Sequence, residues 1–162
     1  MNNLKSILLL TLVLVAGCAT SPFRDESGTI STVGPAHAIA DPATVGERVV
    51  WGGRIAAIEN RAEHTDLFVV SYPLDGSDRP RWRAEGGVRF VVRHPGYLEP
   101  LNYPPGRFVT VLGEVGPGED WPVGEFLNHH AVVTGERIHL WPADPASWSP
   151  RVRFGVGVGI RL

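Results

Sequence analysis

The run Val49-Val-Trp-Gly-Gly-Arg-Ile-Ala-Ala-Ile58 is apolar and rich in β-branched residues, with two adjacent glycines in its middle. Such a run is typical of a β-strand, and glycines inside a strand mark a bulge or a sharp bend. A turn at residues 59–63 leads into a second apolar run, residues 64–72. Together the two runs predict a strongly bent hairpin.

Three more strands are expected downstream. Residues 88–92, 108–115 and 129–141 are apolar runs, separated by a loop at 73–87, by prolines, and by a turn at Gly116-Pro117-Gly118. The segment Gly106-Arg-Phe-Val-Thr-Val-Leu-Gly113 resembles a strand of an oligonucleotide/oligosaccharide-binding (OB) barrel. Because closure removes exposed strand edges, five short strands favour a small barrel over a sandwich. The sequence predicts an all-β, five-stranded, OB-like domain over residues 45–142.

The overall composition agrees with short strands joined by many turns. Glycine (19) and proline (14) together exceed their usual share of roughly 12%, while hydrophobic residues still make up 43% of the chain. The formal net charge is −2, and charges of both signs are interspersed. This balance favours neither a nucleic-acid partner, which selects a basic face, nor electrostatic attraction to anionic lipid headgroups.

The amino-terminal segment has the order of a secretory leader. Lys5 precedes an apolar run of about nine residues, which is too short to span a bilayer as a helix, and small residues follow it. The last four residues, Val15-Ala-Gly-Cys18, resemble the lipobox of bacterial lipoproteins. The resemblance implies a signal peptide at residues 1–17, cleavage before Cys18, and acylation of Cys18. The alternative is a free or buried cysteine behind an ordinary leader.

Residues 18–44 are polar and lack a helical or strand period, apart from a short helical turn expected near residues 42–46. We interpret them as the lipidated amino terminus and a flexible tether. In the lipoprotein pattern, aspartate directly after the lipidated cysteine favours retention in the inner membrane. This chain has Ala19 there, so the resemblance indicates the outer membrane.

Several motifs occur in a recognisable order after the lipobox. They are Val50-Trp-Gly-Gly-Arg-Ile, Val70-Ser-Tyr-Pro-Leu-Asp75, Gly96-Tyr-Leu-Glu-Pro100 and Gly106-Arg-Phe-Val-Thr-Val-Leu-Gly113. This order is similar to the Slp family of outer-membrane lipoproteins, named for starvation-inducible expression, over roughly residues 45–141. The resemblance implies an envelope protein linked to stress physiology. It brings no catalytic residues and no cofactor to this chain.

Residues that could support catalysis or metal binding have simpler interpretations. His129 and His130 are neighbours on a strand and should point to opposite faces, so one ion cannot easily take both. Asp75 is expected to cap its own turn rather than serve a Ser/His/Asp triad with Ser77 and His94. Glu119 and Asp120 are expected to be solvated charges in a turn. We therefore predict no metal site and no catalytic residues.

Tryptophan and arginine supply the one candidate binding site. Trp82 lies between Arg81 and Arg83, an arrangement suited to stacking on a small ligand or a glycan. The simpler interpretation is that Trp82 shields a loop, while Trp51 and Trp141 fill the barrel.

The carboxy-terminal tail, residues 143–162, alternates glycine with valine or isoleucine towards its end. As a strand it would have one aliphatic face and one bare face, so we expect a docked edge strand or a packing interface.

These observations predict an Slp-like lipoprotein of the outer membrane, anchored on its periplasmic face, with a non-enzymatic role in envelope maintenance or starvation adaptation. The expected partners are the membrane, through the lipid, and an envelope protein, with no nucleic acid. The alternative function is a periplasmic OB-like module that binds a small ligand or glycan through Arg81, Trp82 and Arg83.

Overall fold

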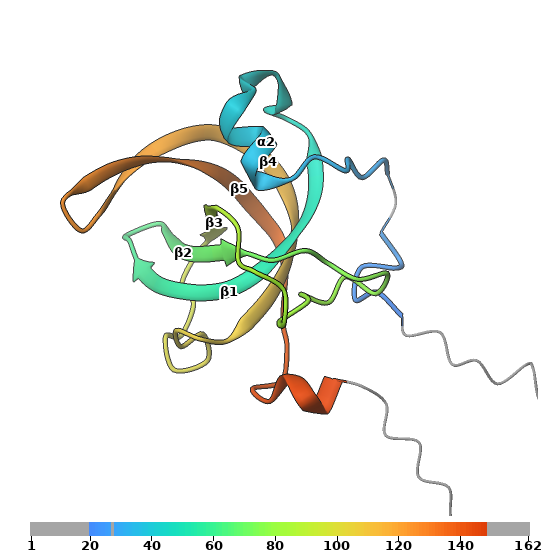
Figure 1. The fold of residues 1–162 in the computed structure, drawn as a ribbon. Coiled ribbons are helices and arrows are strands. Elements are labelled where there is room, and N and C mark those ends of the chain that lie inside the picture. Colours follow the sequence, from blue (N-terminus) through green and yellow to red (C-terminus); the bar gives the residue numbers. More distant parts are fainter. Residues whose placement is uncertain (1–19, 27, 149–162) are drawn as a thin grey trace, which may run out of the picture.

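Five strands and three short helical segments make up the part of the chain that the computed structural model describes, residues 20–26 and 28–148 (Figure 1). The strands are β1 (Arg48–Asn60), β2 (His64–Ser71), β3 (Arg89–Pro95), β4 (Phe108–Val123) and β5 (Phe126–Leu140). The helical segments are α2 (Pro35–Ala40) and the 3-10 turns η2 (Pro42–Thr44) and η3 (Pro145–Trp148). In this part of the chain, no helix is long and apolar enough to cross a membrane.

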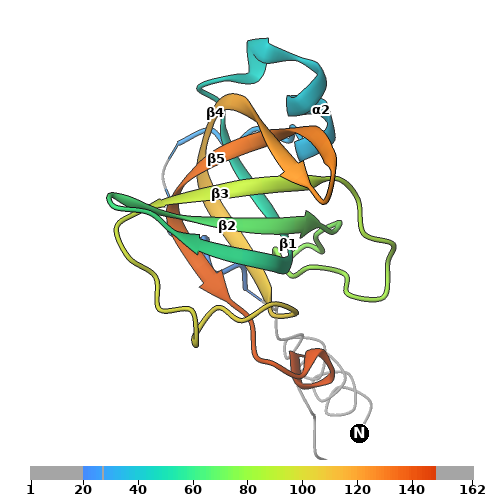
Figure 2. The same ribbon diagram turned by 90° about the vertical axis from the view of Figure 1, so that its left-hand side faces the viewer.

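The strands close into a barrel in the order β1-β2-β3-β5-β4 (Figure 2). All neighbouring pairs are antiparallel except β3 and β5, which are parallel. This is the strand order of a five-stranded OB barrel. The predicted all-β, OB-like fold is confirmed.

β1 is shared between two neighbours, β2 and β4. Gly53 pairs with Ser71 of β2 and with Val109 of β4. A Cβ atom added at Gly53 would lie 1.9 Å from the carbonyl oxygen of Val70. Only glycine allows the strands to approach this closely. The hairpin predicted from the sequence is confirmed, and its register shift lies just after the glycine pair, between Ile55 and Ala57.

The barrel interior is filled by side chains that alternate inward along the strands. Trp51 is 3% exposed and packs edge-on against Phe90, with the ring centroids 5.3 Å apart. The prediction for Trp141 was wrong. It is half-buried and contacts His139 and Trp148 instead of the core, because its indole N–H donates to the Thr110 hydroxyl at 2.8 Å. The core consists of Val49, Trp51, Ile55, Leu67, Val69, Phe90, Val92, Leu98, Val109, Val111, Val115, Ala131 and Val133.

β4 and β5 are longer than the sequence predicted. The expected turn at Gly116-Pro117-Gly118 is a bulge, where the register shifts between Gly116 and Glu119. Pro117 is tolerated there because a bulge residue need not donate a ladder hydrogen bond. The chain turns only at Gly124, whose φ of 63° favours glycine. The β4–β5 hairpin therefore extends beyond the barrel wall (Figure 1).

Residues 20–44, which we call the N-terminal arm, differ from the predicted flexible tether where the structure describes them. Phe23 is 4% exposed, Ser31 forms a parallel bridge with Val49, and the Trp51 indole donates to the Val33 carbonyl at 2.7 Å. Ala38 and Ile39 of α2 pack against the core. The arm lies against the barrel because a few apolar side chains and one sheet bridge fix it. These contacts carry no sequence periodicity. The helical turn expected near residue 42 is η2.

Candidate functional site

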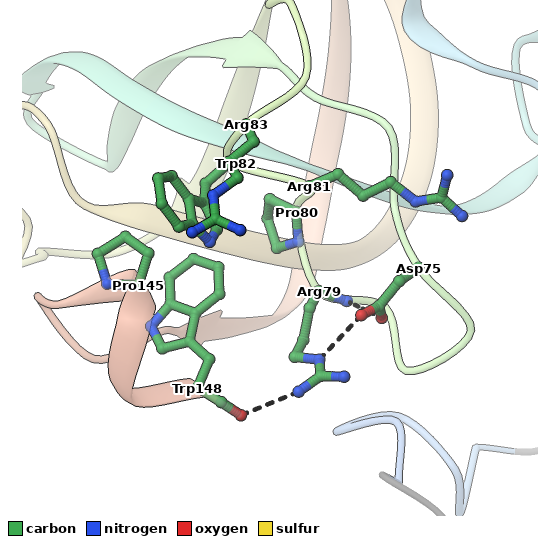
Figure 3. Close-up of a pocket in the computed structure, with 8 residues that line it drawn as sticks. All are labelled: Asp75, Arg79, Pro80, Arg81, Trp82, Arg83, Pro145 and Trp148. Carbon is green, nitrogen blue, oxygen red and sulfur yellow. Dashed lines mark hydrogen bonds and ion pairs between the residues drawn. The ribbon is translucent and has the colours of Figure 1, made fainter. Parts of the chain in front are cut away.

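The predicted binding residues line an open pocket of about 240 Å³ between the 73–87 loop and η3 (Figure 3). The loop supplies one wall and the carboxy-terminal turn supplies the other. The pocket is lined by Asp75, Arg79, Pro80, Arg81, Trp82, Arg83, Pro145 and Trp148.

Asp75 organises the loop, as the sequence predicted. One carboxylate oxygen accepts the backbone N–H groups of Ser77 at 2.8 Å and Arg79 at 3.1 Å, and the other accepts Arg79 Nε at 3.0 Å. Burial raises the pKa of the Asp75 carboxyl, but these N–H donors and the charge of Arg79 outweigh burial and leave the pKa below its ordinary value. Arg79 also donates to the Trp148 carbonyl at 2.9 Å, which holds η3 against the loop.

Arg81, Trp82 and Arg83 are exposed at the mouth of this pocket. The Arg83 guanidinium carbon lies 4.4 Å from the centroid of the Trp82 ring, a stacked cation–π geometry. Within the described residues, no carboxylate forms an ion pair with Arg81 or Arg83. We call these three residues the Arg-Trp-Arg patch. Arg83 lies over the Trp82 ring, whereas the Arg81 side chain extends away from both (Figure 3). The patch therefore offers one stacked and one separate guanidinium group beside an indole, and each guanidinium suits a phosphate or a carboxylate.

Sequence reasoning did not place Trp148 in this pocket. Trp148 was one of five tryptophans noted as possible stacking residues, but no spacing relates it to Trp82. The fold brings the two together, because β5 ends beside the 73–87 loop. Trp148 packs edge-on against Phe108, with ring centroids 5.3 Å apart, and is tilted against Trp141.

A second hollow of about 370 Å³ lies on the outside of β2, between the β1–β2 turn and the β4–β5 hairpin. Phe68 and Trp121 meet there edge-on at 5.0 Å, and Arg61 lies over Trp121 at 5.6 Å. OB barrels use this face and these two connections for ligands. The sequence analysis missed this hollow, because its aromatic residues come from strands that are distant along the chain.

An ion-pair network runs beside this hollow. Arg93 Nε donates to the fully buried Asp66 at 3.0 Å, and Arg93 Nη1 donates to Glu119 at 2.6 Å. Hydrogen bonding to Arg93 holds the pKa of Glu119 below its ordinary value. Glu119 was predicted to be a solvated turn charge. That prediction was wrong because β4 continues through this position and turns the side chain towards Arg93.

His129 and His130 each have a separate partner. His129 is about half exposed and its Nδ1 lies 2.7 Å from Asp120, whereas His130 is 3% exposed and its Nδ1 lies 2.8 Å from the Asn128 carbonyl. The two side chains thus point to opposite sides of β5, as strand alternation requires. Among residues 20–26 and 28–148, no three His, Cys, Asp or Glu side chains cluster closely enough to hold a metal ion.

Two predicted features, Cys18 and the glycine-rich end of the tail at residues 149–162, lie outside the described residues.

Comparison with known proteins gives concordant results. The chain is 30% identical to the uncharacterized lipoprotein YeaY of Escherichia coli K12, over 86% of this chain and 75% of that protein. It is 26% identical to the outer membrane protein Slp of the same organism, over 87% and 77% of the two chains. A small single-stranded DNA-binding protein from Streptomyces coelicolor superposes with a TM-score of 0.36 at 17% identity, covering 63% of this chain and 97% of that one.

The strand order β1-β2-β3-β5-β4, and not this low structural likeness, identifies the OB barrel. The family model described as outer membrane lipoprotein Slp family matches residues 15–154, which include the lipobox, the barrel and the pocket. This chain therefore belongs to the outer membrane lipoprotein Slp family.

Proposed function

We propose that this outer-membrane protein is anchored by acyl chains on Cys18 and faces the periplasm. The observation that carries the proposal is the lipobox Val15-Ala-Gly-Cys18, which lies inside the family match and only two residues before the first described residue, Thr20. Two or three acyl chains hold a protein at a bilayer far more firmly than one, because each buried CH₂ contributes about 0.8 kcal/mol.

The role that we propose is non-enzymatic, in envelope maintenance or starvation and stress adaptation through binding. Family membership supports this role, and so does the pocket, which presents cations and aromatic rings without a paired nucleophile and base. A binding site of this kind selects by charge and shape.

Intact mass and membrane fractionation test the anchor. Wild-type protein from cells should show the mass of the chain from Cys18 plus acyl groups and should sediment with the outer membrane. Cys18→Ser should lack the acyl mass and leave that fraction. A wild-type protein that is unmodified and soluble would refute the proposed anchor.

A second candidate function is the binding of a small ligand or a glycan in the pocket. The specific observation is that the fold gathers Arg81, Trp82 and Arg83 with a second indole, Trp148. Ligand screening should then find a compound whose affinity falls with Trp82→Ala while the circular dichroism is unchanged. Tyr97→Ala is the matched control, because Tyr97 is an aromatic side chain, 67% exposed, outside the pocket. Equal loss in both variants would contradict a specific pocket.

A further inference from the structure

The first contacts of the N-terminal arm limit how far the barrel can stand from the lipid. Ser21 is three residues after Cys18, and three residues of chain span at most about 11 Å. The Ser21 hydroxyl donates to the Asp78 carboxylate, and Phe23 is buried two residues later. The acyl groups proposed above therefore keep the tip of the 73–87 loop within reach of the membrane surface, and a further contact is needed to hold it there.

The Arg-Trp-Arg patch belongs to this same loop. Asp78, which Ser21 contacts, directly precedes Arg79, and Arg79 lines the pocket. Figure 3 shows the beginning of the arm passing beside the turn that contains Asp75 and Arg79. The end of the β4–β5 hairpin lies on the opposite side of the barrel (Figure 1).

We infer that the Arg-Trp-Arg patch binds the phosphate headgroups of phospholipids in the leaflet that holds the acyl chains of Cys18. This inference rests on the proposed anchoring. Arginine forks match phosphate oxygens, and Arg81 and Arg83 have no carboxylate partner among the described residues. Trp82 is 38% exposed, and its ring combines an apolar body with one N–H donor, the chemistry that enriches tryptophan at bilayer interfaces.

The balanced charge of the chain does not oppose this inference. The exposed acids Glu85 and Asp144 flank the pocket residues in sequence and weaken any general field from the arginines. The attraction therefore acts at single phosphate groups within hydrogen-bonding distance. None of the three side chains packs in the barrel core, so all three are available to a partner outside the barrel.

Site-directed spin labelling of the acylated protein tests the inference. Cys18 is the only cysteine, so when it is acylated an introduced cysteine is the only free thiol. Gly76→Cys places a label beside Asp75, because Gly76 is exposed and a Cβ there meets nothing within 4 Å. Glu125→Cys labels the distant end of the β4–β5 hairpin. Both proteins are reconstituted in vesicles of phosphatidylethanolamine and phosphatidylglycerol.

The Gly76→Cys label should collide several-fold less often with a water-soluble nickel chelate than the Glu125→Cys label. Adding Arg81→Gln and Arg83→Gln should remove most of this protection. Adding Arg54→Gln and Arg89→Gln, which change two exposed arginines outside the patch, should preserve it. Circular dichroism shows that each variant is folded.

Each other outcome overturns the inference in a recognisable way. If the two labels are equally exposed in protein that carries the acyl mass, the patch does not bind headgroups, although the proposed anchor is still supported. Protection that survives the Arg81→Gln and Arg83→Gln pair shows that the anchor alone brings the loop to the membrane. A soluble sugar or small anion that binds the patch while the Gly76→Cys label stays in water assigns the patch to a free ligand. An unacylated mass refutes the proposed function, and the inference with it.

Discussion

Two glycines of this chain differ sharply in what they tolerate. Gly53→Ala would place a Cβ against the Val70 carbonyl at the β1 crossing, so the strands must separate. We expect it to lower the free energy of unfolding by about 1–3 kcal/mol or more. Gly76→Ala, with open space around the new methyl group, should change stability by less than about 1 kcal/mol in either direction. Urea unfolding of both variants checks this, and equal midpoints would contradict it.

Glu119 gives the fold an acid-sensitive contact. Its pKa is lower in the folded protein than its ordinary value of 4.5, through the hydrogen bond to Arg93, so the folded state binds fewer protons than the unfolded state. Its contribution to stability is therefore complete above pH 4.5 and is lost as the pH falls through the folded pKa. Urea midpoints between pH 7 and 3 should fall less steeply for Glu119→Gln than for wild type. Glu125→Gln, exposed on the hairpin turn, should retain the wild-type profile, and a Glu119→Gln profile identical to wild type would count against the contact.

Among the structural elements, the N-terminal arm should detach without unfolding the barrel. Phe23 is its buried anchor, with the Arg137 guanidinium 5.5 Å from the ring centroid. Phe23→Ala should make the free energy of docking the arm onto the barrel less favourable by about 3 kcal/mol. Hydrogen exchange should then accelerate at the Ser31 amide, which donates to the Arg48 carbonyl at 2.7 Å, while barrel amides stay protected. Ile30→Ala, at a side chain already 37% exposed, should have a much smaller effect. Unchanged exchange at Ser31 in Phe23→Ala would show that the arm is held elsewhere.

The β4–β5 hairpin combines a buried base and an exposed end. Phe126 and Leu127 are 76% and 70% exposed, so replacing each with serine should change stability by less than about 0.5 kcal/mol. Leu112→Ala, at a fully buried position of β4, should cost about 2–5 kcal/mol. Thermal unfolding of the three variants makes the comparison. A large loss at the exposed end would mean that those side chains are covered in solution.

The sequence predicted each element where one rule governs the local chain. Apolar runs rich in β-branched residues indicated β1, β2 and β3 as strands. Pro117 was misleading, because a bulge in the middle of β4 accommodates residues that usually end a strand. The N-terminal arm was missed because its docking depends on scattered contacts with the barrel, among them the buried Phe23 ring, the bridge at Ser31 and the packing of Ile39. Contacts of that kind are fixed by the folded partner and leave no period in the sequence.

At the scale of the whole molecule, the candidate site was half predictable. Arg81, Trp82 and Arg83 are adjacent in sequence, so their chemistry was visible without a structure. Trp148 joins them only because the barrel closes and β5 ends beside the 73–87 loop. The Phe68–Trp121 hollow likewise required the register of β2 and β4. Sequence patterns report on neighbours along the chain, whereas a pocket made by distant segments depends on closure of the sheet.

The docked arm also lowers the intrinsic affinity for headgroups that the Arg-Trp-Arg patch needs in order to stay occupied. Ser21 contacts the barrel only three residues after Cys18. A connection that short gives the patch an effective local concentration of headgroups in about the millimolar range or above. An intrinsic affinity too weak to detect with free lipid would therefore suffice to keep the patch occupied once the acyl chains are inserted. The unacylated protein should bind the same vesicles poorly, and co-sedimentation of the two forms measures how much the short connection contributes.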